Sequence, residues 1–172
     1  MIICKTTERL VSNKVMNISW NESAVLIDRK SKFQARCCRI KNQNDIPILL
    51  QNLINTNKNV SKASHIHMFA WRTGELSVQS NVEDKAKSKR KNTKKKTHDH
   101  PNDVIKNIQQ GSSDCGEAGA GQRLLTLLER SNIVNVLVIV TRWYGGTPLG
   151  SARFRHISST AVESLKKGGF LT

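Results

Sequence analysis

The stretch Leu124–Gly146, LLTLLERSNIVNVLVIVTRWYGG, decides the fold class of this 172-residue chain. Four leucines in its first five residues share one face of a helix, which predicts a buried helical stripe. Val134–Val140 is almost entirely apolar and β-branched, which is typical of a central strand covered on both faces. Gly145 and Gly146 then predict a loop. A helix packed on such a strand indicates a layered domain.

Elements on either side extend this pattern. Upstream, Val25–Ile27 and Lys32–Ile40 are predicted as two strands joined by a polar turn. A helix that begins at Asp45, with Asn44 as its cap, is expected to follow them. Downstream of the glycine loop, Ser151 is expected to cap a last helix. We therefore expect one α+β domain over residues 1–172.

A third upstream strand is predicted at Ser64–Arg72, SHIHMFAWR, because its residues alternate in character. Ile66, Met68 and Ala70 are expected to face the core. The two histidines, Phe69 and Trp71 are expected on the opposite face, where structural histidines are common.

Most of the positive charge belongs to one segment. The chain carries a formal net charge of +15, from 28 Lys and Arg against 13 Asp and Glu. Lys85–Lys96 alone holds eight cations and no acid, so a surplus of seven remains outside it. Thr73–Gly111 around it lacks periodicity, which predicts a long basic disordered insertion, with a short helix at Asn102–Gln109. The block reads as a solvated loop, a nuclear address or a nucleic-acid tether. Its central cations are Lys89, Arg90, Lys91, Lys94, Lys95 and Lys96.

The composition of the chain limits where in the cell we expect the protein to be. No apolar run reaches about 18 residues, and Met1–Leu10 lacks the apolar core of a signal peptide, so we expect neither a membrane span nor secretion. The four cysteines form no CxxC pair. A cytoplasmic location, with the nucleus as an addition, fits these features.

The glycine-rich loop Gly111–Gly121 is a first candidate for chemistry. It lacks the G-K-[ST] and G-x-G-x-x-G patterns of phosphate loops. Asp114 and Glu117 are spaced as a capping box, which explains both acids, although Mg²⁺ binding is an alternative. Cys115 has no histidine beside it in sequence, which favours an inert or redox-sensitive thiol. We expect no metal and no cofactor.

A cluster of arginines and aromatic residues is the second candidate. It begins where the buried strand ends, which is a common place for ligands. Arginine offers forked donors and the aromatic rings offer stacking faces, although packing and a solvated rim explain them equally well. The candidate partner-binding residues are Arg123, Arg142, Trp143, Tyr144, Gly145, Gly146, Arg153, Arg155 and His156.

These motifs together resemble the signature of the IMPACT family, the eukaryotic relatives of the bacterial YigZ-type proteins. The family pattern has an acidic D-D-G-E loop, then G-x-R-L-L, a buried strand, R-W-Y-G-G, L-G and R-F-x-H-I. The corresponding positions here are Asp114, Gly116, Glu117, Gly121, Arg123–Leu125, Arg142–Gly146, Leu149–Gly150 and Arg153–Ile157. Cys115 replaces the second acid of the pattern, which argues further against a metal or acid–base site.

The resemblance implies a two-layer βα sandwich like the second domain of a small-subunit ribosomal protein. It also implies translational control, in which eukaryotic members restrain the stress kinase of initiation factor 2α by competing for that kinase's activator, and some members bind actin. The family's RWD domain and the YigZ-type ferredoxin-like domain are expected to be absent, leaving a solitary IMPACT domain.

Three functional hypotheses follow. The first is a nonenzymatic regulator of translation initiation under stress that binds protein partners, namely the kinase, its activator or ribosome-associated proteins. The second is an RNA- or ribosome-binding module. The third is an enzyme that acts on a phosphorylated ligand at Asp114 and Glu117.

Overall fold

A single antiparallel sheet forms the centre of the computed structural model, which describes residues 18–77 and 104–172. The strands lie in the order β1-β3-β6-β4-β5, and β2 also pairs with β3. The strands are β1 (Asn21–Glu22), β2 (Leu26–Asp28), β3 (Ser31–Arg39), β4 (His65–Ser77), β5 (Val104–Ser113) and β6 (Val136–Trp143). The predicted mixed α/β class with a β-sheet is confirmed, and the sequence pattern missed the short β1.

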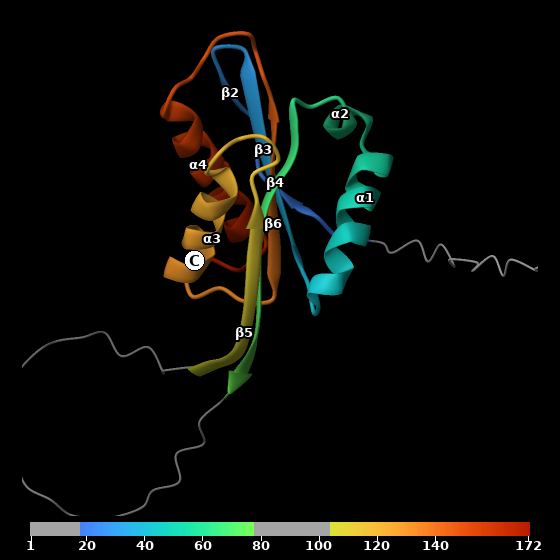
Figure 1. Cartoon of the computed structure of the whole chain (residues 1–172), viewed down its shortest axis with the longest axis vertical. Coiled ribbons are helices and arrows are strands. Elements are labelled where there is room, and N and C mark those ends of the chain that lie inside the picture. The colour runs from blue at the N-terminus through green and yellow to red at the C-terminus, as the bar shows by residue number, and fades with distance from the viewer. Residues whose placement is uncertain (1–17, 78–103) are drawn as a thin grey trace, which may run out of the picture.

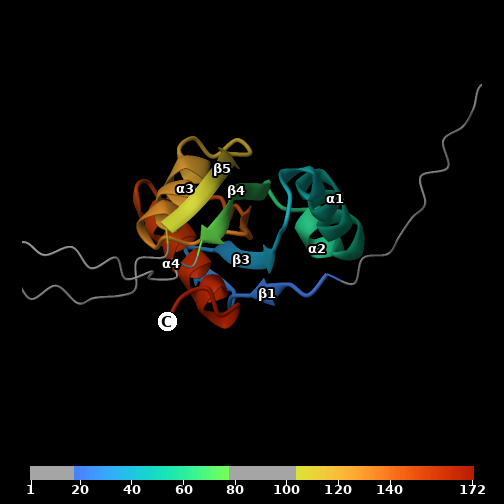
Figure 2. The ribbon, with the colours of Figure 1, turned by 90° about the horizontal axis from the view of Figure 1, so that it is seen from below.

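Helices cover both faces of this sheet (Figures 1 and 2). On one face lie α3 (Ala120–Arg130) and α4 (Ala152–Lys167), and on the other lie α1 (Ile46–Thr56) and α2 (Lys58–Ser61). A 3₁₀ turn, Gln43–Asp45, leads into α1. The expected two-layer sandwich is therefore wrong, because α1 and α2 add a third layer. Among the described residues, no helix is both long and apolar enough to cross a bilayer.

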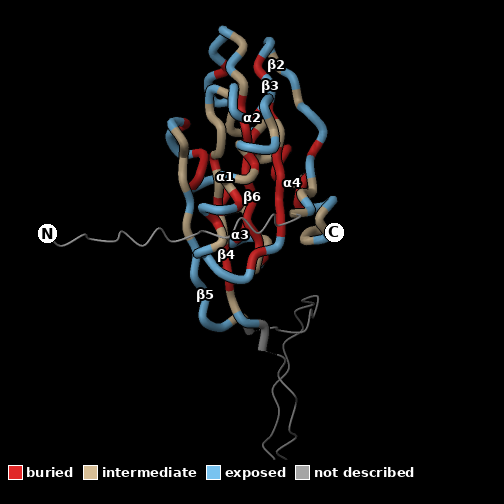
Figure 3. Tube along the Cα trace, turned by 90° about the vertical axis from the view of Figure 1, so that its right-hand side faces the viewer, coloured by how far each residue is buried: buried red, intermediate tan, exposed pale blue. Residues whose placement is uncertain are grey.

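The side chains of β6 explain the three layers. Val136, Val138 and Val140 pack into the cluster beneath α3 and α4. Leu137 and Ile139 pack into the second cluster, beneath α1. All five are completely buried, as the expectation of a doubly covered strand requires (Figure 3). Two apolar faces on one central strand stabilise helices on both sides.

The alternation expected for Ser64–Arg72 breaks at its start. Pairing between β4 and β6 shifts register between His65 and Met68, which indicates a β-bulge. Met68 and Ala70 face α3 and α4 as predicted, but Ile66 packs in the opposite cluster with Phe69 and Trp71. The assignment of Ile66 is wrong because the bulge adds one residue to the alternation. Phe69 and Trp71 are partly buried against this second cluster, since the second face of the sheet is also covered.

The ends of the proposed insertion are ordered strands. β4 continues to Ser77 and β5 begins at Val104, and the two strands pair from Phe69–Ser113 to Ser77–Val104. The predicted helix at Asn102–Gln109 is therefore wrong, because the described part of this segment pairs as an edge strand. The lysine block, Lys85–Lys96, lies outside the described residues, as does Met1–Leu10.

The helix caps differ in detail from the predictions. The side chain of Asn42, rather than that of Asn44, accepts a backbone N–H bond and caps the 3₁₀ turn that precedes α1. Ser151 precedes α4 as expected but makes no capping bond through its side chain. The sequence therefore predicted where each helix begins to within a few residues, but it did not identify the side chain that caps it.

Candidate functional site at the end of β6

The centre of the predicted site is a buried carboxylate. Glu117 lies between β5 and α3, and its side chain is only 8% exposed. It accepts hydrogen bonds from Arg142 on β6 and from Nε of Arg153 at the start of α4. The Nε2 atom of His65 lies 3.5 Å from the same carboxylate. One glutamate thus ties together the loop, the central strand and the last helix.

Arg142 is a structural member of this cluster. Its side chain is 6% exposed, and its guanidinium group lies 5.4 Å from the Phe33 ring and 5.5 Å from the Tyr144 ring. Its Nε has no hydrogen-bond partner among the described residues. Burial of a charge is costly unless the charge is paired, so Glu117 is the group that makes this position tolerable.

The two acids of the loop have separate tasks. The Asp114 carboxylate accepts the backbone N–H groups of Gly119 at 3.0 Å and Gly121 at 2.7 Å, at the start of α3. Gly119, with a φ of +84°, precedes the helix. The predicted capping box is therefore half wrong, because Asp114 caps the helix while Glu117 turns toward the arginines. The two carboxylates do not converge on one point.

The fold brings a histidine to Cys115. The Nδ1 atom of His67 lies 3.1 Å from the Cys115 sulfur, and that of His65 lies 3.0 Å from the Cys115 carbonyl oxygen. Burial lowers the pKa of His67, which favours its neutral form. The sequence carried no signal for this pair, because 48 residues separate the two side chains.

The cysteines are expected to differ sharply in reactivity. Burial raises the pKa of Cys37, and burial together with Cys37 raises that of Cys38 to about 12. At pH 8, a thiol of that pKa is ionised in roughly one molecule in ten thousand.

In the native protein, iodoacetamide should therefore modify the partly exposed Cys115 at least about tenfold faster than buried Cys37 or Cys38. Mass spectrometry of the separate peptides measures this, and modification of Cys38 at the rate of Cys115 would contradict the burial described. Protein in denaturant is the control, in which the rates should converge.

The remaining predicted residues divide between internal contacts and open surface. His156 contacts Asp28 at 2.8 Å and thereby lowers the pKa of that carboxyl. The Trp143 indole donates to the Asn59 carbonyl oxygen at 2.9 Å. Arg123 lies over the Phe154 ring at 5.2 Å but remains exposed, as does Arg155. Of the residues in this paragraph, Arg123 and Arg155 are therefore free to contact a partner directly, whereas His156 and Trp143 are engaged in contacts within the protein.

The glycines of the motif have structural requirements. A Cβ on Gly145 would lie 2.2 Å from the backbone of Lys30, which leaves no room for a side chain. Gly146 has open space around it, but its φ of +87° favours glycine. Both residues shape the loop that follows β6 and hold it near the β2–β3 turn.

Comparison with known proteins identifies relatives for this arrangement. The model of the Impact N-terminal domain matches residues 29–165. IMPACT family member YDL177C of Saccharomyces cerevisiae is 65% identical over 158 residues, which are 88% of this chain and 93% of that protein. Protein IMPACT homolog of the same yeast is 30% identical over 151 residues, which are 88% of this chain but 47% of that protein. The chain thus spans about half the length of this second relative.

Solved structures agree with the fold. The structure of the two-domain translational regulator Yih1 is 28% identical, with a TM-score of 0.51 over 99% of this chain and 56% of that one. A hypothetical protein that is 21% identical has a TM-score of 0.55, over 84% of this chain and 56% of its own, and shows the fold alone. The family model covers the Glu117 cluster, the R-W-Y-G-G loop and most of α4. The chain therefore belongs to the IMPACT family.

Proposed function

We propose that this protein is a nonenzymatic regulator of translation initiation that acts in stress signalling by binding protein partners. The observation that carries the proposal is its membership of a family whose relative Yih1 is described as a translational regulator. The partner class is the machinery around the kinase of initiation factor 2α, namely that kinase, its activator or ribosome-associated proteins. Actin is a further candidate partner, on the family resemblance alone.

A shallow basic groove between α3 and α4 is the surface we assign to this contact. It has a volume of about 480 Å³ and includes Arg123 and Arg130, with no acidic residue in its lining. Both side chains are exposed, and Arg155 lies exposed on the neighbouring helix. Arginine is enriched among residues that dominate binding energy, and these cations fit an acidic protein surface.

The nonenzymatic part of the proposal rests on how Glu117 is used. The Glu117 carboxylate is buried, and each of its oxygens already accepts a hydrogen bond from an arginine, so it is not open to a substrate. Asp114 is likewise occupied by backbone N–H groups of the helix start. Both acids therefore support the loop and helix, which accords with a binding protein.

Affinity purification of the intact chain tests the proposed surface. We expect Arg123→Ala/Arg130→Ala to reduce recovery of the kinase activator or ribosome-associated proteins by roughly 5- to 30-fold, the loss typical of one or two important contacts. Lys41→Ala/Lys58→Ala removes the same charge from other exposed positions and should leave recovery unchanged.

Two further arms separate the alternatives. Deletion of the protein should change phosphorylation of initiation factor 2α under amino-acid starvation. RNase treatment of half of each sample separates direct protein contacts from tethering through RNA. Absence of translational partners after RNase treatment, together with unchanged phosphorylation on deletion, would refute the proposal.

A further inference from the structure

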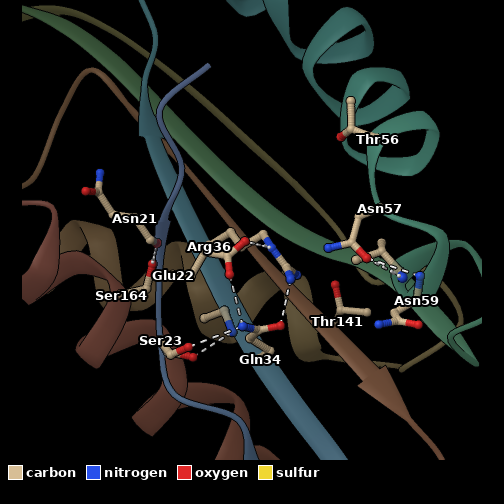
Figure 4. A network of polar contacts seen from close by, with 12 residues as sticks. Asn21, Glu22, Ser23, Gln34, Arg36, Thr56, Asn57, Asn59, Thr141 and Ser164 are labelled. Atoms are coloured by element: carbon tan, nitrogen blue, oxygen red, sulfur yellow. Dashed lines mark hydrogen bonds and ion pairs between the residues drawn. The ribbon is translucent and has the colours of Figure 1, made fainter. Parts of the chain in front are cut away.

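A second cavity lies on the opposite side of the sheet from the α3–α4 groove. It has a volume of about 540 Å³, within the usual range for small-molecule sites. The first half of β3, the α1–α2 junction and the end of β6 with the loop after it line this cavity. Figure 4 shows two of its walls, with Gln34 and Arg36 on β3 and Asn57 and Asn59 at the α1–α2 junction. Its lining is Val25, Lys30, Lys32, Gln34, Arg36, Asn57, Asn59, Lys62, Trp143 and Tyr144.

The alternation of β3 explains why this part of the sheet is polar. Phe33, Ala35 and Cys37 point into the core beneath α3 and α4. The residues between them, Lys32, Gln34 and Arg36, therefore face the α1–α2 side of the sheet, where an apolar core would be expected. This half of the face instead forms the cavity, so its polar character is not required by packing.

Arg36 is the residue that most needs an explanation. Its side chain is only 3% exposed, so a permanent charge is almost wholly buried. Nε donates to Glu22 at 2.7 Å, and Nη2 donates to Gln34 at 2.6 Å. Nη1 has no partner among the residues that the structure describes. Figure 4 shows the guanidinium group extending from β3 toward Asn57 and Thr141. A buried guanidinium with two free N–H donors is costly unless an acceptor enters the cavity.

The charge of the cavity selects an anion. Lys30, Lys32 and Lys62 join Arg36 in the lining, and no acid lines it. Glu22 contacts Arg36 from β1 and neutralises one of these four charges, which leaves an excess of about three. The three lysines are exposed, so they can close on a ligand without a large desolvation cost. Phosphate matches both the forked arginine donors and the mobile lysines.

Aromatic residues form one wall of the same cavity. The bond from the Trp143 indole to Asn59 fixes that ring against α2. Tyr144 is 47% exposed, and the Arg142 guanidinium group lies 5.5 Å from its ring. An exposed ring beside a phosphate-binding group is suited to stacking of a nucleobase.

We propose that this cavity binds a nucleoside phosphate, with the phosphate at Arg36 and the lysines and the base against Tyr144. The ligand is a free nucleotide or one nucleotide of a single-stranded RNA, since both present the same chemistry. The proposal is independent of the protein-binding surface, because the two lie on opposite faces of the sheet.

Titration of the intact protein at low salt tests the site, with AMP, adenosine, inorganic phosphate and a 5′-phosphorylated oligoadenylate as probes. AMP should bind at least about tenfold more tightly than adenosine or phosphate, because only AMP uses both halves of the cavity. Tyr144→Ala should weaken AMP by roughly 5- to 100-fold, the range for loss of one stacked base. Tighter binding of the oligoadenylate identifies RNA as the source, and equal or weaker binding identifies a free nucleotide.

Charge variants locate the phosphate. Lys32→Ala/Lys62→Ala should weaken AMP by roughly tenfold or more, as expected for two charge-assisted contacts. Lys58→Ala/Lys166→Ala removes the same charge from exposed positions outside the cavity and should bind AMP as the wild type does. Arg36→Gln should abolish binding, and the lysine pair keeps the test decisive if Arg36→Gln does not fold. Undetectable AMP binding, equal binding of AMP and phosphate, or equal losses in both lysine pairs would each overturn the proposal.

Discussion

Replacement of Glu117 by alanine is expected to lower the free energy of unfolding by about 3–5 kcal/mol, the usual result of removing one partner from a buried ion pair. The principal cost comes from Arg142, whose side chain is 6% exposed and would lose its acidic partner. Arg153 is 28% exposed, so it can recover part of its loss by contacting water. Urea unfolding followed by tryptophan fluorescence measures the change.

A matched control and a double variant make this prediction specific. Lys167 is 51% exposed near the end of α4 and pairs with Glu163 at 2.9 Å, so Lys167→Ala, which breaks only this exposed pair, should cost less than about 1 kcal/mol. Combining Glu117→Ala with Arg142→Met should cost about 1–3 kcal/mol less than the two changes added together, because the residues share one interaction. Strict additivity, or a loss below 1 kcal/mol for Glu117→Ala alone, would show that the cluster does not support the fold.

The buried strand was the most predictable part of the fold. Five consecutive residues of β6 are wholly buried because an almost uninterrupted apolar run can lie only in the middle of a covered sheet. β5 was missed because, as an edge strand, it carries polar and exposed residues such as Lys106 and Gln109. Its pairing with β4 depends on residues far away in the chain, which local periodicity does not record.

The sequence predicted which residues form the site, but it did not predict which of them contact one another. Glu117 and the arginines that pair with it, Arg142 and Arg153, stood out by the family pattern. The capping box was assigned to both acids, but only Asp114 binds the helix start, because spacing cannot tell which carboxylate turns inward. The neighbours His67 and Cys115 were not foreseeable, nor was the cavity at Arg36, since each depends on how separate elements pack.

Gly145→Ala is the second change expected to have a large effect. The added Cβ would lie 2.2 Å from the Lys30 carbonyl carbon and 2.4 Å from the Ser31 nitrogen. Both are backbone atoms, so no side-chain rotation can relieve the clash. The Gly145 N–H also donates to the Ser31 hydroxyl at 3.1 Å, and separation of the loop from the turn would break that bond. We expect a loss of about 3 kcal/mol in the free energy of unfolding, at the upper end for overpacking.

Gly146 provides the control, because its backbone angle, rather than a lack of space, is what favours glycine there. No atom lies within 4 Å of a Cβ on Gly146, so Gly146→Ala meets only the strain of its φ of +87°. That strain costs about 1–2 kcal/mol. Chemical denaturation of both variants should therefore rank Gly145→Ala as the more damaging. The opposite order would mean that the loop can move away from the β2–β3 turn, and backbone conformation rather than close packing would then determine the glycine pair.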